Sequence, residues 1–152
     1  MKLIKYAFAL ALLASPVAAQ DVIEGKALAL DGDTILVTLN DGKAVKVRLG
    51  GIDAPEMKAW PWGPQARGVL DEILRTEGPY VRCRPEGKSH DRIVAECDAG
   101  KTSAGPFAFG VGRAMIRSGF AVEYRIFTKG IYAVDEDRAR MERRGIWKDW
   151  PQ

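Results

Sequence analysis

The chain lacks most of the residues that build the commonest nucleophile and metal sites. Its 152 residues include two cysteines and one histidine, His90. A structural zinc site needs four ligands, so this set leaves the count short, and a single histidine gives little support to a serine triad. The sequence also has no phosphate loop, no complete dinucleotide-binding glycine pattern and no zinc-protease motif. These absences leave carboxylates and arginines as the candidates for chemistry.

Long apolar runs are missing too, apart from a short one near the start. It covers Tyr6–Ala14, follows two lysines, and precedes small residues that end at Ala19. The run is too short to span a bilayer comfortably, and this order of segments is typical of a secretory signal peptide. We predict a cleaved signal over residues 1–20 and one domain over residues 21–152. An uncleaved N-terminal anchor is the alternative.

A large excess of one charge is also lacking. The sequence has 23 Lys and Arg against 20 Asp and Glu, and the predicted signal removes two lysines and no acid. A nearly neutral domain has no overall basic field to attract nucleic acid, so any polyanion must bind at a local patch. We expect a secreted or periplasmic monomer that has no stable membrane insertion once the signal is cleaved.

The two cysteines, Cys83 and Cys97, are predicted to form a disulfide. An even cysteine count in an exported protein is typical of a disulfide bond. Two strand-like runs carry them, Pro79–Arg84 and Arg92–Cys97, and Pro85–Gly87 between these runs suits a hairpin turn. Two buried free thiols are the alternative.

The hydrophobic pattern after the signal predicts strands. Three apolar runs, the second and third alternating with period two, cover Val22–Leu30, Thr34–Asn40 and Ala44–Leu49. The tripeptide Asn40-Asp41-Gly42 predicts a hairpin turn between the last two. In the third strand the alternation turns the apolar residues inward and places Lys46 and Arg48 on the opposite face.

Three further segments are predicted as helices. They cover Pro64–Arg75, Phe107–Ser118 and Tyr132–Arg144, with an extended piece at Phe120–Phe127. Strands, a helix, and then strands and helices again predict an α+β fold, a small antiparallel β-barrel plus helices.

Two acidic segments follow the predicted strands closely. Asp31–Thr34 reads Asp-Gly-Asp-Thr, in which Asp33 is the better-placed metal ligand and Asp31 an outer helper, although the same dipeptide also forms plain turns. Asp53–Glu56 reads Asp-Ala-Pro-Glu, in which Pro55 stiffens the loop. Carboxylates and a backbone carbonyl are ligands that Ca²⁺ accepts. The alternative for the second segment is a helix-entry turn with solvated acids.

Arg48 lies five residues before Asp53 and faces away from the apolar stripe. A guanidinium binds phosphate through two parallel hydrogen bonds and keeps its proton, which suits a developing phosphorane-like charge. The alternative is a surface arginine on an exposed strand face.

In this order and spacing the segments resemble the staphylococcal nuclease, or thermonuclease, family. The resemblance continues in Ile116–Ala121 and Arg143–Trp147, and it spans about Val22 to Trp147. It implies a five-stranded OB-fold barrel with about three α-helices. It also implies Ca²⁺-dependent cleavage of single- or double-stranded DNA and RNA at the 5′ P–O bond, which leaves 3′-phosphate products.

The resemblance also implies a role for each residue of the two segments. Asp33 and Asp53 would be carboxylate ligands of Ca²⁺, and Ala54 would add its backbone carbonyl. Glu56 would be the general base, and Arg48 the first phosphate-binding arginine.

A second phosphate-binding arginine is implied at Arg92. The family has Tyr-Gly-Arg where this chain reads His90-Asp91-Arg92. His90 would take the substrate contact of the tyrosine, or it is an exposed loop histidine, and Asp91 could pair with Arg92. Tyr124 falls near the place where the family holds tyrosines against the nucleotide. Two other functions stay open, a catalytically idle OB-fold binding module and an envelope phosphodiesterase linked to polysaccharide metabolism.

Overall fold

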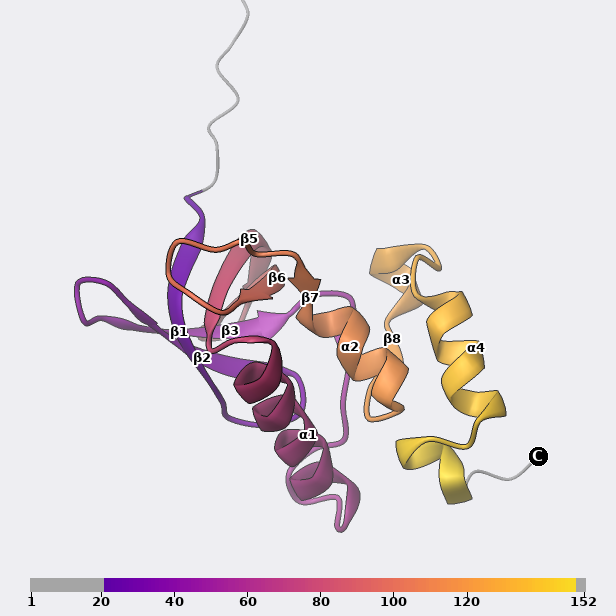
Figure 1. Ribbon diagram of the computed structural model, residues 1–152. Coiled ribbons are helices and arrows are strands. Elements are labelled where there is room, and N and C mark those ends of the chain that lie inside the picture. The colour runs from indigo at the N-terminus through magenta and orange to yellow at the C-terminus, as the bar shows by residue number, and fades with distance from the viewer. Residues whose placement is uncertain (1–20, 150–152) are drawn as a thin grey trace, which may run out of the picture.

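The computed structural model describes residues 21–149, and the predicted signal at 1–20 lies outside them (Figure 1). Five strands form a closed barrel: β1 (Ile23–Ala29), β2 (Thr34–Leu39), β3 (Ala44–Leu49), β5 (Tyr80–Ser89) and β6 (Arg92–Gly100). They run in the order β3-β2-β1-β5-β6, and a parallel pairing between β3 and β6 closes the ring. The predicted α+β barrel of OB type is confirmed.

The barrel core follows the predicted alternation. Ile35 and Val37 of β2 and Val47 and Leu49 of β3 are buried, and together with β1, β5 and β6 they fill the interior. Because successive side chains of a strand point to opposite faces, the residues between them remain at the surface or at the site. Arg48 is one of these.

The helices cover one side of the barrel. They are α1 (Trp62–Glu77), α2 (Val111–Ser118), the single-turn α3 (Arg125–Thr128) and α4 (Ala133–Met141), followed by the 3₁₀ turn η1 (Gly145–Asp149). Helix α2 lies between the barrel and α4 (Figure 1). The helix predicted over Pro64–Arg75 is confirmed as α1, which buries Ala66, Leu70 and Leu74 against the barrel side. No helix within residues 21–149 has the length and apolarity that a membrane span needs.

The prediction of a turn at Pro85–Gly87 is wrong. Strands β5 and β6 stay paired past this point, and the chain turns only at His90-Asp91. Pro85 is opposite Ala95 and Gly87 is opposite Val94, so Glu86 is the extra residue of a β-bulge. A bulge accommodates the proline, which has no N–H to offer the ladder, so the proline and glycine interrupt the hairpin without ending it.

The predicted elements after β6 are partly wrong in their bounds. The second helix begins at Val111 because Phe109–Gly110 forms β7, which pairs with β6. The piece predicted as extended over Phe120–Phe127 contains the short strand β8 (Val122–Glu123) and then α3. Strand β8 pairs with β4 (Ile52–Asp53) in a second, two-stranded sheet.

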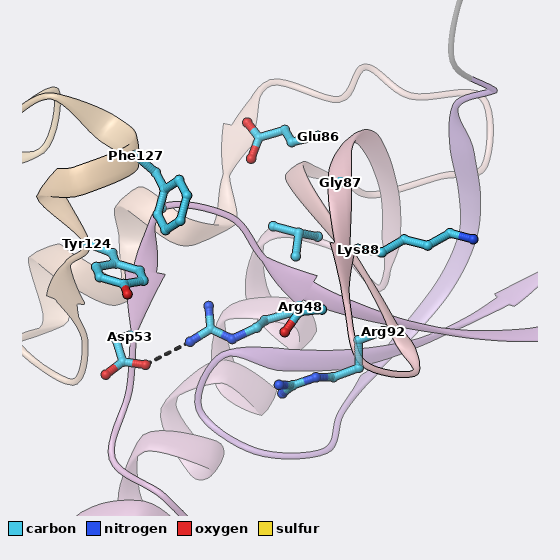
Figure 2. A pocket seen from close by; sticks show the side chains of 11 residues that line it. Arg48, Asp53, Glu86, Gly87, Lys88, Arg92, Tyr124 and Phe127 are labelled. Atoms are coloured by element: carbon cyan, nitrogen blue, oxygen red, sulfur yellow. Dashed lines mark hydrogen bonds and ion pairs between the residues drawn. The ribbon is translucent and has the colours of Figure 1, made fainter.

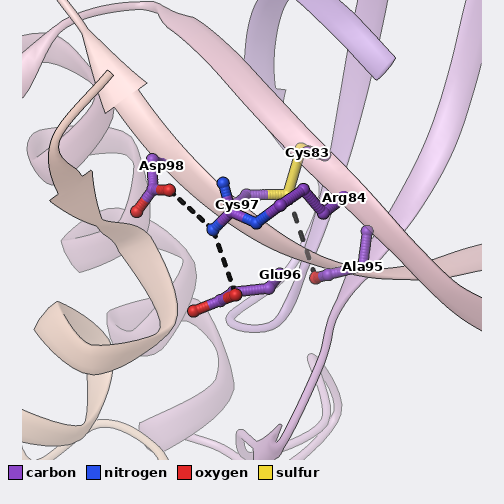
Figure 3. The surroundings of a disulfide bond; sticks show 6 residues. All are labelled: Cys83, Arg84, Ala95, Glu96, Cys97 and Asp98. Atoms are coloured by element: carbon purple, nitrogen blue, oxygen red, sulfur yellow. Dashed lines mark hydrogen bonds and ion pairs between the residues drawn. A yellow bond between two sulfur atoms is a disulfide. The ribbon is translucent and has the colours of Figure 1, made fainter. Parts of the chain in front are cut away.

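The predicted disulfide between Cys83 and Cys97 is confirmed (Figure 3). The two residues are directly opposite one another on β5 and β6, with a Cα–Cα distance of 4.1 Å. Both side chains are buried in the core cluster. The bridge therefore fastens the hairpin that carries Glu86 and Arg92.

Candidate active site

Arg48 joins the two predicted acidic segments. Its Nη2 atom donates to Oδ2 of Asp33 at 3.0 Å and to Oδ1 of Asp53 at 2.7 Å, and its Nη1 atom donates to the carbonyl of Ile52 at 3.0 Å. In the ladder Arg48 is opposite Thr34, which brings Asp33 beside it. The turn at Gly50-Gly51, where Gly51 has φ of 73°, sends the chain back so that Asp53 reaches the same guanidinium.

Asp33 is the buried member of this group. Its Oδ2 atom also accepts the N–H of Ala54 at 3.2 Å, and its Oδ1 atom accepts the hydroxyl of Thr34 at 3.0 Å. Burial raises the pKa of Asp33 above its ordinary value, and the positive charge of Arg48 opposes this shift. The neighbouring Asp31 accepts the backbone N–H of Asp33, so it fixes the turn.

Asp53 is more exposed than Asp33, with 61% of its side chain accessible. Its backbone is held by the second sheet, in which Asp53 is opposite Val122 of β8. The N–H of Tyr124 donates to the carbonyl of Gly51 at 2.9 Å, which extends this attachment. The β4–β8 pair therefore fixes Asp53 and Tyr124 relative to one another.

Arg92 is not held by Asp91. The Asp91 carboxylate accepts from Lys46 Nζ at 2.7 Å instead, and the hydrogen bond to Lys46 lowers the pKa of Asp91. Arg92 donates from Nη1 to the hydroxyl of Thr34 at 3.1 Å and makes no ion pair within residues 21–149. Its charge is therefore available to an anion beside Arg48.

These residues lie at a cleft of about 700 Å³ (Figure 2). Of the predicted site residues, Arg48, Asp53, Arg92 and Tyr124 line it. The rings of Tyr124 and Phe127 pack edge to face, with their centroids 4.9 Å apart, and form an aromatic wall. The cleft thus joins two arginines, a lysine, two carboxylates and a pair of aromatic rings, which together can hold a phosphate and the group attached to it.

Four predicted site residues are not part of the cleft lining, namely Asp33, Ala54, Glu56 and His90. Ala54 is half-buried beneath Asp33, and Glu56 is exposed on the loop before α1, where its carbonyl accepts the N–H of Ala59. His90 lies at the tip of the β5–β6 hairpin, with φ of 57°, and lines a separate hollow with Lys46.

The lining residues that the sequence does not predict as site residues include Glu86, Lys88 and Phe127. The first two stand on the part of β5 that extends past the predicted turn. A sequence pattern for a longer β5 strand would have placed both residues beside the site. The Pro-x-Gly pattern predicted a turn there instead. Phe127 lies on α3, a single turn without a hydrophobic period of its own.

Comparison with known proteins gives consistent results. The family model for staphylococcal nuclease homologues matches residues 46–149. An uncharacterized endonuclease of Escherichia coli is 30% identical over 135 residues, which cover 88% of this chain and 82% of that protein. The succinoglycan biosynthesis protein ExoI of Rhizobium meliloti is 29% identical over 144 residues, which cover 88% of this chain and 69% of that protein.

A third relative, an uncharacterized endonuclease of Haemophilus influenzae, is 28% identical over 121 residues, with 78% of this chain and 62% of that protein covered. The matched family region contains Arg48, Asp53 and Arg92, and the aligned lengths extend across most of the barrel and its helices. Family model, relatives and barrel topology agree, and the chain belongs to the staphylococcal nuclease family.

Proposed function

We propose that this protein is an exported nuclease that hydrolyses phosphodiester bonds of DNA and RNA with the help of Ca²⁺. The observation that carries the proposal is the meeting of Asp33 and Asp53 at one nitrogen of Arg48, beside a cleft that Arg92 also lines. Relatives named as endonucleases at about 30% identity support it.

The carboxylates fit a hard cation. Asp33 and Asp53 converge on a single positively charged atom, so the two oxygens already share one cationic partner. Within residues 21–149 no group of three His, Cys, Asp or Glu side chains forms a metal site, which leaves the carbonyl of Ala54 and water to complete the set. Oxygen ligands of this kind are those that Ca²⁺ accepts. The ion would act as a Lewis acid on a phosphate oxygen.

The side chains would then divide the remaining work. Arg48 and Arg92 line one cleft, and their guanidinium groups would stabilise the charge that develops on the phosphate. Glu56 would take a proton from the attacking water as general base. Attack in line with the 5′ oxygen would leave a 3′-phosphate product.

The experiment uses the purified domain with single- and double-stranded DNA and RNA, in Ca²⁺ or in a chelator. We expect cleavage only with Ca²⁺, and Glu56→Gln should slow it by about 10²- to 10⁴-fold without changing the circular dichroism spectrum. The matched control is Glu24→Gln, the same change on β1, where the carboxylate pairs with Arg82 at the surface. Equal rates for Glu56→Gln and Glu24→Gln would exclude Glu56 as the base.

A second candidate function is a phosphodiesterase of envelope polysaccharide metabolism. The relative named as a succinoglycan biosynthesis protein favours it, because its match covers as much of this chain as the endonuclease match does. The cleft would bind a phosphodiester in either case. Hydrolysis of a phosphodiester-linked glycan, together with intact nucleic acids in the same assay, would select this alternative, and binding without any hydrolysis would indicate an idle binding module.

A further inference from the structure

Glu86 occupies an unusual position for an acidic residue in a cleft that would bind a polyanion. It is the extra residue of the β5 bulge, between Pro85 opposite Ala95 and Gly87 opposite Val94. Bulges next to active sites commonly redirect a side chain. Here the redirected side chain lines both the main cleft and an adjoining hollow of about 180 Å³.

The Glu86 carboxylate lies close over the turn that follows β3. A Cβ atom added to Gly50 would meet the Oε2 atom at the far end of this flexible side chain, which places the carboxylate beside the turn. Among residues 21–149 no side chain or backbone group donates a hydrogen bond to Glu86 or forms an ion pair with it. The neighbouring Glu96, in contrast, pairs with Arg84 at 3.0 Å. Glu86 is exposed, so its carboxylate is free to accept hydrogen bonds from water or from a bound ligand.

The two ends of the cleft differ in chemistry. Figure 2 shows Glu86 and Phe127 together at the end away from Arg92, whereas Arg48 and Arg92 lie toward the other end. Phosphate fits the arginine end, and like-charge repulsion excludes it from Glu86. The group next to a bound phosphate would meet an aromatic face and an unpaired carboxylate.

A nucleobase satisfies both demands. Its flat face stacks on aromatic rings with little dependence on sequence, and its amino hydrogens are donors for a carboxylate. Guanine presents two adjacent donors on its Watson–Crick edge, whereas thymine and uracil present a single N–H between two carbonyl oxygens, which a carboxylate repels. We propose that Glu86 is a specificity-determining residue that favours guanine, and disfavours thymine or uracil, beside the bound phosphate. This inference rests on the proposed nucleic acid substrate.

Binding is measured first, so that the test does not depend on catalysis. The Glu56→Gln protein with Ca²⁺ is titrated into fluorescein-labelled oligothymidine and into the same oligonucleotide with one central guanine, by fluorescence anisotropy. We expect about tenfold tighter binding of the guanine oligonucleotide, as one bidentate contact provides. Adding Glu86→Gln should reduce the ratio to less than about twofold. Adding Glu96→Gln, the same change at a carboxylate already paired with Arg84, should leave the ratio unchanged.

Cleavage provides the second reading. Sequencing of product ends from a random single-stranded DNA pool should show guanine enriched at one position beside the cut for the wild type and for Glu96→Gln, and lost for Glu86→Gln. Equal binding of both oligonucleotides, or a profile that Glu86→Gln leaves unchanged, would overturn the inference while the nuclease proposal stands. Guanine-selective binding without cleavage would overturn the nuclease proposal and keep the inference. No binding of either oligonucleotide would overturn both.

Discussion

The Nη2 atom of Arg48 lies 2.7 Å from the Oδ1 atom of Asp53. The same nitrogen also donates to Asp33, so a single arginine connects the segment that enters β2 with strand β4. Arg48 is only 17% exposed in its side chain. Its guanidinium therefore serves two purposes, the pairing of two carboxylates in the folded protein and the binding of phosphate in the proposed reaction.

Two substitutions of Arg48 should distinguish its structural role, the pairing of two carboxylates, from its proposed role in binding phosphate. Arg48→Lys keeps a positive charge near Asp33 but loses the planar group that reaches two carboxylates at once. We predict that kcat/KM falls by about 10²- to 10³-fold, as for other lost transition-state donors, while Tm stays within a few degrees. Arg48→Met should lower activity equally and also destabilise the protein, because it leaves the Asp33 carboxylate buried without a cation. Steady-state kinetics and calorimetry check both variants.

Gly63 is predicted to position Glu56. A Cβ atom added to this buried glycine would collide with the backbone of Glu56 and Met57. Gly63→Ala should cost about 1–3 kcal/mol of stability through overpacking. A displacement of Glu56 by about 1 Å should lower kcat by about 10²-fold, with KM little changed.

Gly68, in the same helix, provides the matched control. Nothing lies within 4 Å of a Cβ added there. Gly68→Ala should therefore stabilise α1 by about 0.5–1 kcal/mol and leave kcat unchanged. Equal kcat values for the two alanine variants would refute a positioning role for Gly63.

The disulfide should contribute substantially to stability. Cys83 and Cys97 are separated by 14 residues in sequence, and closure of a loop near this length is worth about 3 kcal/mol in the chain-entropy model. Reduction, or the double change Cys83→Ala and Cys97→Ala, should lower Tm by about 10 °C for a domain of this size. Thiol titration of the unfolded, unreduced protein should detect no reactive thiol. Two reactive thiols would contradict the bridge.

Glu86 should make stability depend on pH. Partial desolvation of the carboxylate raises its pKa above the ordinary 4.5, Glu96 adds to the shift, and Arg84 opposes it. The folded state therefore holds the proton more tightly, so the free energy of unfolding falls as pH rises from about 4.5 through the folded pKa. We predict that Glu86→Gln has a higher Tm than the wild type at pH 7.5 and a smaller advantage at pH 4.

Asp41 should give a pH dependence of stability that is opposite in sign to that of Glu86. The N–H of Lys43 lowers its pKa below the ordinary 3.8, so its ionised form stabilises the folded state at pH values above 3.8. Asp41→Asn should therefore reduce Tm slightly at pH 7.5, with the difference shrinking as pH falls below 3.8. Parallel pH profiles for the two variants would show that Glu86 is not shifted by burial.

Local patterns in the sequence predicted the barrel strands well. Alternation is a property of consecutive residues, so Ile35, Val37, Val47 and Leu49 could be assigned to the core, and Arg48 to the opposite face, without tertiary information. The disulfide followed from cysteine count and strand order. The order and spacing of Asp31–Thr34 and Asp53–Glu56 indicate a shared site, and the structure joins Asp33 and Asp53 through Arg48.

Features that depend on distant partners could not be predicted. Asp91 pairs with Lys46 and not with Arg92, and Lys46 is 45 residues away from Asp91 in sequence. The local sequence predicts a turn at Glu86. A bulge can be identified there only from the register of the opposing strand. The local pattern predicts a helix at Phe109 and Gly110, but their pairing with β6 outweighs that pattern and makes them a strand.

The parallel pairing that closes the barrel also brings the two arginines of the proposed site together. It joins Val47–Leu49 of β3 to Ile93–Ala95 of β6, and so places Arg48 and Arg92 on neighbouring strands. Contacts between segments so far apart in sequence form late, because a long loop must first be closed. Without this pairing the two arginines are not held on neighbouring strands, so the proposed phosphate site depends on closure of the barrel.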